Sequence, residues 1–469
     1  MSGSTGQAGD LPRTAAPPTP SPRAGWTAVS VFLVLYALAY LDRQVLTLLV
    51  DPIRQDLGAT DFEISLLQGA AFVLFYTICA LPIGWAVDRY PRRRVIFVGI
   101  LVWSIAAAAG GLARNYWQLL LCRFGVGAGE AALSPSAYSM LSDLFPKERL
   151  AGAMAVFSTG AIIGGAISLT VGGLVVSLAK GAEGYVIPLL GEVRPWQLVF
   201  LITGAPGVVL AFLVFLVREP TRRGRIAAKV SKGLGVGALI PFLRSRWRFY
   251  AAHILGFSAF NLTVAAYVAW TPTFLMRKYG LSAAETGFTL GGLSLVCGVA
   301  GMLGSGFIVD RLFRRGLKDA HLRYYAVGAA LCGVAGVGAM LVPTLPLAIA
   351  CMSVVKVISP FIAVAAAALQ ITTPNEYRGQ VSALFLFVYN ILGFGLGPSI
   401  VAGISDFVIG GGRGDIGLAM AVTFAMFTPL AVGAFIAGLR PMRRAVDAAE
   451  AWDAPWAPRR RTGDRCGAS

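Results

Sequence analysis

Charged side chains are scarce in this sequence. Asp, Glu, Lys and Arg make up 13% of its 469 residues, whereas hydrophobic residues make up 56%. Soluble domains usually carry about 25% charged residues, and a soluble protein of this length could not cover its surface with so few. The scarcity excludes an ordinary cytosolic enzyme, a disordered protein and a nucleic-acid-binding domain, and it indicates an integral membrane protein.

Histidines and paired cysteines are also scarce. The chain has two His and six Cys, and no two Cys stand in a CxxC pair. Five of the six Cys lie inside apolar runs, so we interpret them as small buried hydrophobic residues rather than disulfides or zinc ligands. The glycines around 125–129 and 233–237 lack the strand or Lys context of a nucleotide site. We therefore expect no metal, no cofactor and no enzymatic activity.

Long apolar runs recur from residue 28 to residue 438. Each is long enough to cross a hydrocarbon layer of about 30 Å as a helix, and a continuous run favours a helix over a barrel strand. The runs predict an all-α integral membrane protein with twelve transmembrane helices. The expected spans are 28–50, 64–87, 95–113, 117–143, 151–179, 196–217, 250–276, 286–309, 324–343, 346–370, 380–406 and 417–438.

Lys and Arg are unevenly shared between the two sets of loops that these spans create. With both termini inside, the inner segments carry thirty of these residues and the outer segments seven. Because cytoplasmic loops are enriched in Lys and Arg, we expect a multi-pass protein of the cytoplasmic (inner) membrane with both termini cytoplasmic. Topology and attraction to anionic membrane lipids then explain the net charge of +17. We expect no nucleic-acid partner, and we expect a monomer.

One loop motif occurs twice. Gly84, Asp88, Arg89, Arg92 and Arg93 recur at the same spacing at positions 306, 310, 311, 314 and 315, and a Gly stands thirty residues before each Asp. Both copies follow the second span of a group of six, which predicts two pseudo-symmetric six-helix halves. The expected division is a disordered cytoplasmic N-terminus (1–25), a first bundle (26–217), a basic cytoplasmic linker (218–248), a second bundle (249–438) and a cytoplasmic tail (439–469).

These motifs resemble those of a known family over nearly the whole chain. The repeated loop resembles the loop between helices 2 and 3 of the Major Facilitator Superfamily, and residues 123–130 resemble its helix 4 motif. A narrower set resembles the Spinster-like transporters. That set comprises Tyr40, Asp42, Arg43, Gln44, Gly127, Gly129, Glu130, Ala131, Ser134, Pro135, Ser142, Asp143, Pro146, Glu148 and Arg149. The resemblance implies proton-coupled transport of lysolipids or sphingolipid-type amphiphiles.

Five charged residues fall well inside the expected spans: Asp42, Arg43, Arg123, Glu130 and Lys356. A charge near the bilayer centre costs roughly 2.5–3.5 kcal/mol on insertion scales, so such residues usually face a polar interior and mark an ion or substrate path. Since Asp42 and Glu130 are the only acids among them, we interpret these two as the proton-coupling carboxylates. The alternative to a role in transport is a buried structural ion pair. This alternative carries more weight for Arg123 and Lys356 than for the other three residues.

The cations and a few amides suit substrate binding. Arginine binds phosphate and carboxylate groups through two parallel hydrogen bonds, so Arg43, Arg123 and Lys356 indicate an anionic or zwitterionic head group. Asn261, Tyr389 and Asn390 are plausible polar lining residues in the second half. The aromatic residues nearby could accept an acyl chain, although packing is the more common role of such side chains.

The repeated loops are interpreted as parts of a cytoplasmic gate. A carboxylate at a helix end can accept hydrogen bonds from the N-terminal N–H groups of another helix, and the arginines can pair with acids across the inner face. The alternative is anchoring by positive charge alone. The gate residues that we expect are Gly84, Asp88, Arg89, Arg92, Arg93, Asp143, Asp310 and Arg311.

The combined interpretation is a proton-coupled secondary active transporter that works by alternating access of its two halves. It carries a lysolipid, a sphingolipid-like molecule or another amphiphile. A proton-driven exporter of drugs or small organic anions is the main alternative. A membrane lipid receptor that binds without transport is a further one.

Overall fold

The computed structural model describes residues 22–145, 147–179, 185–187, 191–220, 236–410 and 415–453. Almost all of these residues are helical, as the long apolar runs predict. The exception is an antiparallel hairpin between two helices, with strand β1 (Tyr185–Ile187) paired to β2 (Gly191–Val193). This hairpin was not expected from the sequence.

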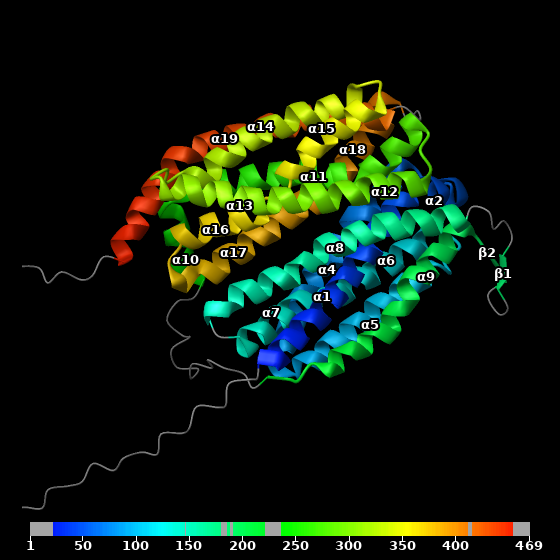
Figure 1. Ribbon diagram of the computed structural model, residues 1–469, viewed down its shortest axis with the longest axis horizontal. Coiled ribbons are helices and arrows are strands. Elements are labelled where there is room, and N and C mark those ends of the chain that lie inside the picture. The colour runs from blue at the N-terminus through cyan, green and yellow to red at the C-terminus, as the bar shows by residue number, and fades with distance from the viewer. Residues whose placement is uncertain are drawn as a thin grey trace, which may run out of the picture.

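The first half of the chain forms one lobe (Figure 1). Short 3-10 or π-helical turns, η1 (Val45–Leu48), η2 (Leu66–Ala70) and η3 (Ala211–Leu216), continue three of its helices. Its helices are α1 (Pro22–Gln44), α2 (Val50–Leu57), α3 (Asp61–Ser65), α4 (Ala71–Arg89), α5 (Arg92–Gly110), α6 (Tyr116–Glu130), α7 (Leu133–Leu144), α8 (Lys147–Ala179) and α9 (Pro195–Leu210).

The second half forms the other lobe. Its π-helical turns are η4 (Ser294–Gly298), η5 (Ile391–Gly395) and η6 (Ile404–Ile409). Its helices are α10 (Val236–Ser245), α11 (Trp247–Tyr279), α12 (Ala283–Leu293), α13 (Val299–Arg314), α14 (Ala320–Leu341), α15 (Leu345–Ile358), α16 (Ile362–Thr372), α17 (Asn375–Asn390), α18 (Gly397–Gly403) and α19 (Asp415–Asp453).

Eleven helical segments within the described ranges are long and apolar enough to cross a membrane. The remaining expected span, 117–143, is occupied by α6 and α7, which are separated by a turn at residues 131–132. Pro135 explains the break, because it has no N–H to donate to the carbonyl of Ala131 and its ring crowds that carbonyl. The helical membrane architecture is confirmed. The hairpin, this division and a similar break between Ile358 and Ile362 inside the expected span 346–370 are the departures.

The two lobes meet at one end of the molecule. Both described ends of the chain lie at the other end (Figure 1), which we call the terminal end; the end at which the lobes meet is the opposite end. The main contact between the lobes is that of α8 with α12, and α18 also packs against α3 and η2. The lobes diverge toward the terminal end, where α7 and α10 lie (Figure 1).

Glycines allow the close contact of α8 with α12. A Cβ at Gly287 would lie 1.9 Å from the carbonyl oxygen of Leu169, and a Cβ at Gly173 would lie 2.3 Å from that of Ala283. No larger residue fits at either distance. Small residues are a common means by which helices in membranes approach closely, and here they hold one lobe against the other.

The internal repeat is visible in the backbone at the opposite end. Gly58 (φ +64°) ends α2, and Gly280 (φ +69°) ends α11. Two residues after each Gly, a capping box begins the next helix, from Thr60 to Glu63 in one lobe and from Ser282 to Glu285 in the other. Both glycines adopt a left-handed conformation that side chains disfavour, which explains why a Gly occurs in each copy.

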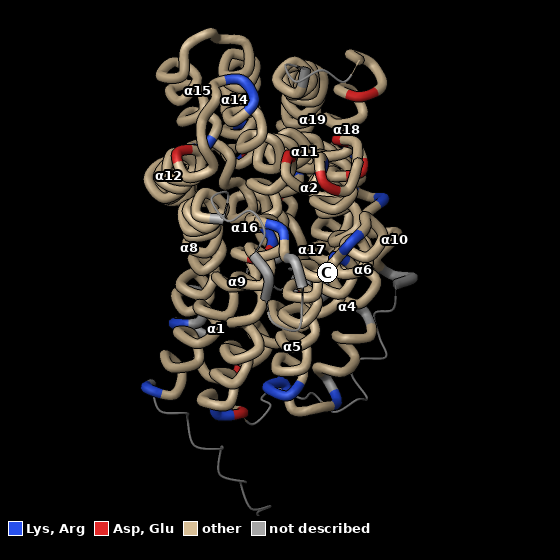
Figure 2. The backbone as a smooth tube through the Cα atoms, turned by 90° about the vertical axis from the view of Figure 1, so that its right-hand side faces the viewer, with Lys and Arg blue, Asp and Glu red and all other residues tan. Residues whose placement is uncertain are grey.

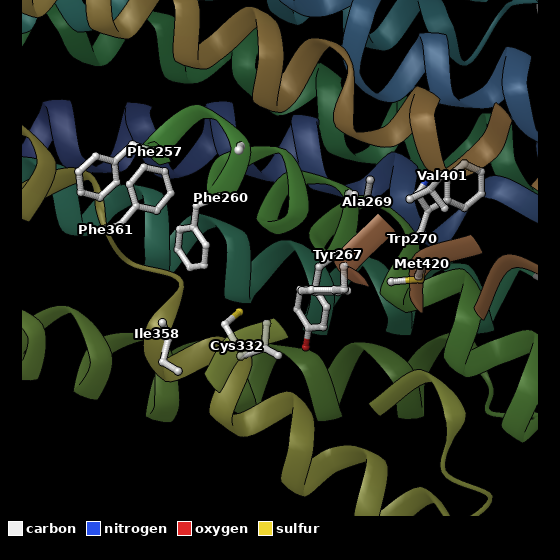
Figure 3. Packing of buried hydrophobic residues seen from close by; sticks show 14 of the residues in the cluster. Phe257, Phe260, Tyr267, Ala269, Trp270, Cys332, Ile358, Phe361, Val401 and Met420 are labelled. Atoms are coloured by element: carbon white, nitrogen blue, oxygen red, sulfur yellow. The ribbon is translucent and has the colours of Figure 1, made fainter. Parts of the chain in front are cut away.

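Apolar side chains fill the interior of both lobes. Lys, Arg, Asp and Glu positions are sparse along the helices in Figure 2. In the second lobe, Phe257 of α11 packs on Phe361 at a ring distance of 5.6 Å (Figure 3). His253 is fully buried beside the same cluster, 4.8 Å from the Phe257 ring. This placement fits the packing role that is common for a lone histidine in an apolar helix.

Candidate functional site

Two helices of the first lobe bring four charged side chains together in its interior: Asp42 and Arg43 from α1, and Arg123 and Glu130 from α6. The Nη2 atom of Arg43 donates to Oε2 of Glu130, forming an ion pair between the helices. The Glu130 side chain is 2% exposed and that of Arg43 is 24% exposed. The pair therefore has one buried partner and one partner that remains accessible.

Asp42 and Arg123 are buried beside this ion pair. Nη1 of Arg123 donates to the backbone carbonyl of Asp42 at 3.4 Å, and its guanidinium lies 5.3 Å from the Phe200 ring. Neither carboxylate oxygen of Asp42 has a hydrogen-bond partner among the described residues. Adjacent residues diverge by about 100° around a helix, which explains why Arg43 reaches Glu130 while Asp42 does not.

The glycines of α6 place Glu130 in the interior. A Cβ at Gly127 would lie 2.5 Å from the carbonyl oxygen of Phe72 in α4. A Cβ at Gly129 would lie 2.6 Å from the carbonyl oxygen of Gly99 in α5. α6 therefore packs directly against two neighbouring backbones, which the sequence motif allows only because these positions lack side chains.

Aromatic rings surround the Arg43 guanidinium. Its Cζ lies 4.2 Å from the centre of the Phe72 ring and 4.8 Å from that of Tyr40. Tyr36, one turn before Tyr40, stacks on Phe157 of α8 at 4.7 Å. Cation–π contacts of this kind stabilise a charge that is partly removed from water.

A cavity of about 190 Å³ lies between the two lobes, next to this cluster. Tyr40 and Gln44 of α1 line one side, and Tyr267 of α11 and Lys356 of α15 line another. The Nζ atom of Lys356 is 5.8 Å from the Tyr267 ring, and no carboxylate of the described residues lies within 4 Å of it. Tyr40 therefore contacts Arg43 and also borders the cavity that holds Lys356.

The predicted lining residues of the second lobe lie close together. Asn261 of α11 is 2% exposed, and its Nδ2 donates to the backbone carbonyl of Tyr389 at 3.0 Å. The Tyr389 ring stacks on Phe385 at 5.5 Å, and Asn390 is half-buried at the end of α17. Asn261 thus fastens α11 to α17, and its role as a substrate ligand stays a prediction.

Arg92 of the predicted gate is the centre of a buried network at the terminal end. Its Nη1 donates to Oδ2 of Asp143 at 2.5 Å, and its Nε donates to Oε1 of Glu219 at 3.1 Å. The Glu219 carboxylate also accepts from the backbone N–H groups of Arg92 and Arg93, at 3.1 and 3.0 Å. Glu219 thus places a negative charge at the N-terminus of α5.

Glu219 was not among the expected site residues. It directly precedes Pro220, whose carbonyl accepts a hydrogen bond from Nη2 of Arg92. The available signal was a lone acid in a strongly basic linker. The network joins the start of α5, the end of α7 and the segment that follows η3. It therefore stabilises the first lobe, and among the described residues it does not connect the two lobes in the conformation seen here.

The other residues of the first loop motif make fewer contacts. The Arg89 guanidinium lies 4.3 Å from the ring of Trp85, on the exposed side of α4. A Cβ at Gly84 would meet nothing within 4 Å. The side chain of Asp88 lies outside the described part of the structure. The gating role of these residues stays a prediction.

The second copy of the motif is exposed at the end of α13. Asp310 and Arg311 both face solvent, and neither forms an ion pair within 4 Å among the described residues. The two copies therefore differ in this conformation, since only the first is part of a buried network. Within the same residues, no group of three or more His, Cys, Asp or Glu is placed to hold a metal ion.

An ion-pair cluster that was not expected from the sequence joins the lobes at the opposite end. Nη2 of Arg277, from α11, donates to Oδ1 of Asp51 at 2.6 Å, and its Nη1 donates to Oδ2 of Asp61 at 2.7 Å. The Arg277 side chain is 5% exposed. The count of basic residues placed Arg277 in an outer segment but gave no information on its acidic partners, which only the three-dimensional packing shows.

Comparison with known proteins places this architecture among transporters. A sequence profile of the Major Facilitator Superfamily matches residues 32–398. An MFS-type efflux pump of Mycolicibacterium smegmatis is 29% identical over 387 residues, which cover 82% of this chain and 85% of that protein. A probable L-galactonate transporter of Escherichia coli is 28% identical over 315 residues, covering 65% and 66% of the two chains.

The Spinster proteins are also similar. Protein spinster of Drosophila melanogaster is 24% identical over 305 residues, covering 62% of this chain and 47% of that protein. Among solved structures, a bacterial homologue of the human lysosomal transporter Spinster, crystallised inward-facing and unoccupied, superposes with a TM-score of 0.72. The match has 23% identity and covers 93% of this chain and 100% of that chain, so it shows the fold.

Proposed function

The chain belongs to the Major Facilitator Superfamily, and on that premise we propose that it is a proton-coupled secondary transporter of an amphiphile with an anionic or zwitterionic head group. The observation that carries the proposal is the charged cluster of α1 and α6. In this cluster the partly exposed Arg43 pairs with the buried Glu130, beside the buried Asp42. Charges so placed usually serve an ion or substrate path.

Asp42 is the better-placed proton site of the two acids. Its carboxylate is buried and has no hydrogen-bond donor among the described residues. An ionised carboxylate in such surroundings is costly, and a bound proton removes that cost. Glu130 is held by Arg43 instead. If a substrate head group draws Arg43 away, Glu130 loses its partner and becomes the second proton site, so binding and protonation are coupled through Arg43.

The cations next to the cavity suit a negatively charged head group. Arg43 remains 24% exposed, and Lys356 borders the cavity with no carboxylate of the described residues within 4 Å. Guanidinium groups bind phosphate and carboxylate strongly. The Tyr40 ring, which borders the cavity and lies 4.8 Å from the Arg43 guanidinium, adds an apolar surface for a chain beside the charge. This combination of a charged and an apolar surface fits an amphiphile.

Alternating access follows from the arrangement of the lobes. At the opposite end they are closed by glycine-mediated packing and by the Arg277 cluster, while at the terminal end they diverge. If the terminal end is cytoplasmic, as the basic residues predict, this conformation opens inward. Transport then requires the closed end to open as the terminal end closes.

A proton-driven exporter of drugs or small organic anions is the second candidate, and the size of the cavity favours a small anion over a drug. Its volume of about 190 Å³ is small, since sites for drug-sized ligands usually measure about 300–1,000 Å³. An efflux pump and a galactonate transporter are among the similar proteins. A sugar acid would need Arg43 and Lys356 but no apolar surface.

Flux into liposomes tests the proposal and separates the two candidates. Purified protein is reconstituted, and uptake of a lysophospholipid and of galactonate is measured with and without an imposed pH gradient. We expect gradient-dependent flux of the lysophospholipid. Gradient-dependent flux of galactonate alone would favour the second candidate. Saturable binding of either compound without flux would contradict both and indicate a receptor.

Lys356→Gln is the matching variant for the head-group site. Loss of a charge-assisted hydrogen bond, worth roughly 1.5–3 kcal/mol, corresponds to about ten- to a hundredfold weaker binding. Lys318→Gln is its control, because Lys318 is half-buried at the terminal end, away from the cavity, and pairs with Asp447 at 2.6 Å. The site is misassigned if both variants bind the substrate as the unchanged protein does.

A further inference from the structure

A groove separate from the central cluster opens at the terminal end of the second lobe. It lies between the first turns of α11 and the last part of α19 and has a volume of about 920 Å³. Four arginines line it: Arg246, Arg248, Arg440 and Arg444. No Asp or Glu is among the described residues that line it.

Three of these guanidinium groups have no acidic partner in the part of the chain that the structure describes. Arg248, Arg440 and Arg444 are exposed, and none forms an ion pair within 4 Å among the described residues. The neighbouring Arg443 differs, because its Nε donates to Asp319 at 2.8 Å. Burial raises the pKa of Asp319, but hydrogen bonds from Arg323 and Arg443 bring it below its usual value. Among the described residues, the positive charge of the groove is therefore uncompensated, whereas Asp319 pairs with the adjacent Arg443.

The fourth arginine holds the walls of the groove in place. Nη1 of Arg246 donates to the backbone carbonyls of Thr372 at 3.1 Å and Ala445 at 3.5 Å. These bonds join the start of α11 to the end of α16 and to the last part of α19. Arg246 is also the N-cap residue of α11, and its side chain makes no capping hydrogen bond. The first N–H groups of a helix lack partners within it and favour an anion.

The groove also has an apolar part with exposed side chains. Trp247 is 59% exposed and Leu255 is 55% exposed. Tryptophan is enriched where a membrane meets water, and Arg248 lies 5.7 Å from the Trp247 ring. The floor consists of small side chains that leave room for a chain along it. These are Ala251, Ala252, Ala434 and Ala437.

We propose that this groove binds one anionic phospholipid from the leaflet at the terminal end. Its phosphate contacts Arg248, Arg440 and Arg444, and one acyl chain lies along the alanine floor beside Leu255. Basic pockets between helices at the cytoplasmic surface are suited to acidic head groups. The proposal is independent of the transported substrate, because none of these residues borders the central cavity. A zwitterionic lipid would match the apolar floor but would not use the uncompensated charge.

Native mass spectrometry of the full-length protein in detergent measures the binding. Phosphatidylglycerol and phosphatidylcholine with identical acyl chains are titrated, and the fraction of protein with one bound lipid is recorded. The variant is Arg440→Gln combined with Arg444→Gln. The control is Arg314→Gln combined with Arg315→Gln, which removes the same charge at the same end of the molecule, outside the groove. Glycerol 3-phosphate is the soluble probe for the head group alone.

We expect phosphatidylglycerol to bind more tightly than phosphatidylcholine. An arginine near a membrane surface contributes about fivefold to the affinity for acidic lipids, so the double variant should bind phosphatidylglycerol roughly twenty- to thirtyfold more weakly. The control variant should bind it as the unchanged protein does. Because the substituted arginines are exposed and unpaired, both variants should elute as folded protein in size-exclusion chromatography.

Three results would overturn the proposal. One is an equal loss of affinity in both variants, which would indicate general surface attraction. Another is no loss in either. The third is displacement of the lipid by glycerol 3-phosphate at equal concentration, which would show that the acyl chain adds nothing and that the site takes a soluble phosphate. Should the double variant aggregate, Arg440→Lys combined with Arg444→Lys keeps the charge and should retain most of the preference for phosphatidylglycerol.

Discussion

Asp51 and Asp61 belong to the first lobe, and Arg277 belongs to the second. Among the described residues, Arg277 is the only side chain of the second lobe that pairs with these two acids, and Arg277→Gln removes it. The guanidinium makes hydrogen bonds to both carboxylates, at 2.6–3.3 Å. Its side chain is 5% exposed, and that of Asp61 is 4% exposed. The substitution therefore leaves a buried carboxylate without its main partner, but only while the lobes are in contact at this end.

The size of the effect follows from burial. Removing one member of a buried ion pair costs about 3–5 kcal/mol. Two features reduce this cost: Asp51 is 27% exposed, and Arg54 remains 3.7 Å from Asp61. We expect about 2 kcal/mol, which weakens the closed arrangement of the opposite end about thirtyfold. If that arrangement holds about 99% of molecules, the variant lowers it to roughly 77%.

Distance measurements between spin labels at Ser142 and Ser245, in a cysteine-depleted background, report this shift. Both sites are exposed at the terminal end, in different lobes. Arg277→Gln should add a population with a shorter distance, since the terminal end closes as the opposite end opens. Arg194→Gln is the control, because the Arg194–Asp56 pair at the same end lies within one lobe. Equal distance distributions in both variants and the unchanged protein would refute the reasoning.

The remaining predictions concern packing and topology. Arg92→Gln should lower the thermal unfolding midpoint far more than Arg93→Gln, because only the first of these arginines is buried in an ion-pair network. Disrupting such a network costs about 3–5 kcal/mol, and equal midpoints for the two variants would contradict the prediction. Gly287→Ala should disrupt the contact between the lobes and reduce thermal stability, whereas Gly292→Ala, with open space around its Cβ, should not; a harmless Gly287→Ala would refute it. Ser282→Cys should react with an impermeant thiol reagent only from outside intact cells, and exclusive labelling from inside would reverse the predicted topology.

The transmembrane architecture was predictable because lipid constrains the sequence strongly. A helix must be apolar over its whole crossing, so the spans are visible without knowledge of packing. The repeat was equally visible, since the same residues recur at the same spacing. Gly58 and Gly280 recur because their positions need a left-handed backbone. The division of one span at Pro135 was also within reach of the sequence, because a proline removes the hydrogen bond to the residue four positions before it.

The pairing of charges was harder to predict. Adjacent residues such as Asp42 and Arg43 diverge by about 100° around a helix, and the structure shows Arg43 on Glu130. The sequence could not indicate that Asp42 would lack a hydrogen-bond donor. The partners of Arg277 and Arg92 are separated from them by long stretches of chain, 216 residues in the case of Asp61. Such contacts depend on how helices pack and leave no periodic signal in the sequence.

The central claim is that Asp42 and Glu130 carry the protons that drive transport. The most direct measurement is pH-gradient-driven substrate flux in liposomes for the double variant Asp42→Asn, Glu130→Gln. Its control is Asp56→Asn combined with Asp447→Asn, two acids whose ion pairs lie outside the cluster. We expect the double variant to lose gradient-driven flux but keep substrate binding, and we expect the control to retain both. Gradient-driven flux at the unchanged level in the double variant would contradict the claim.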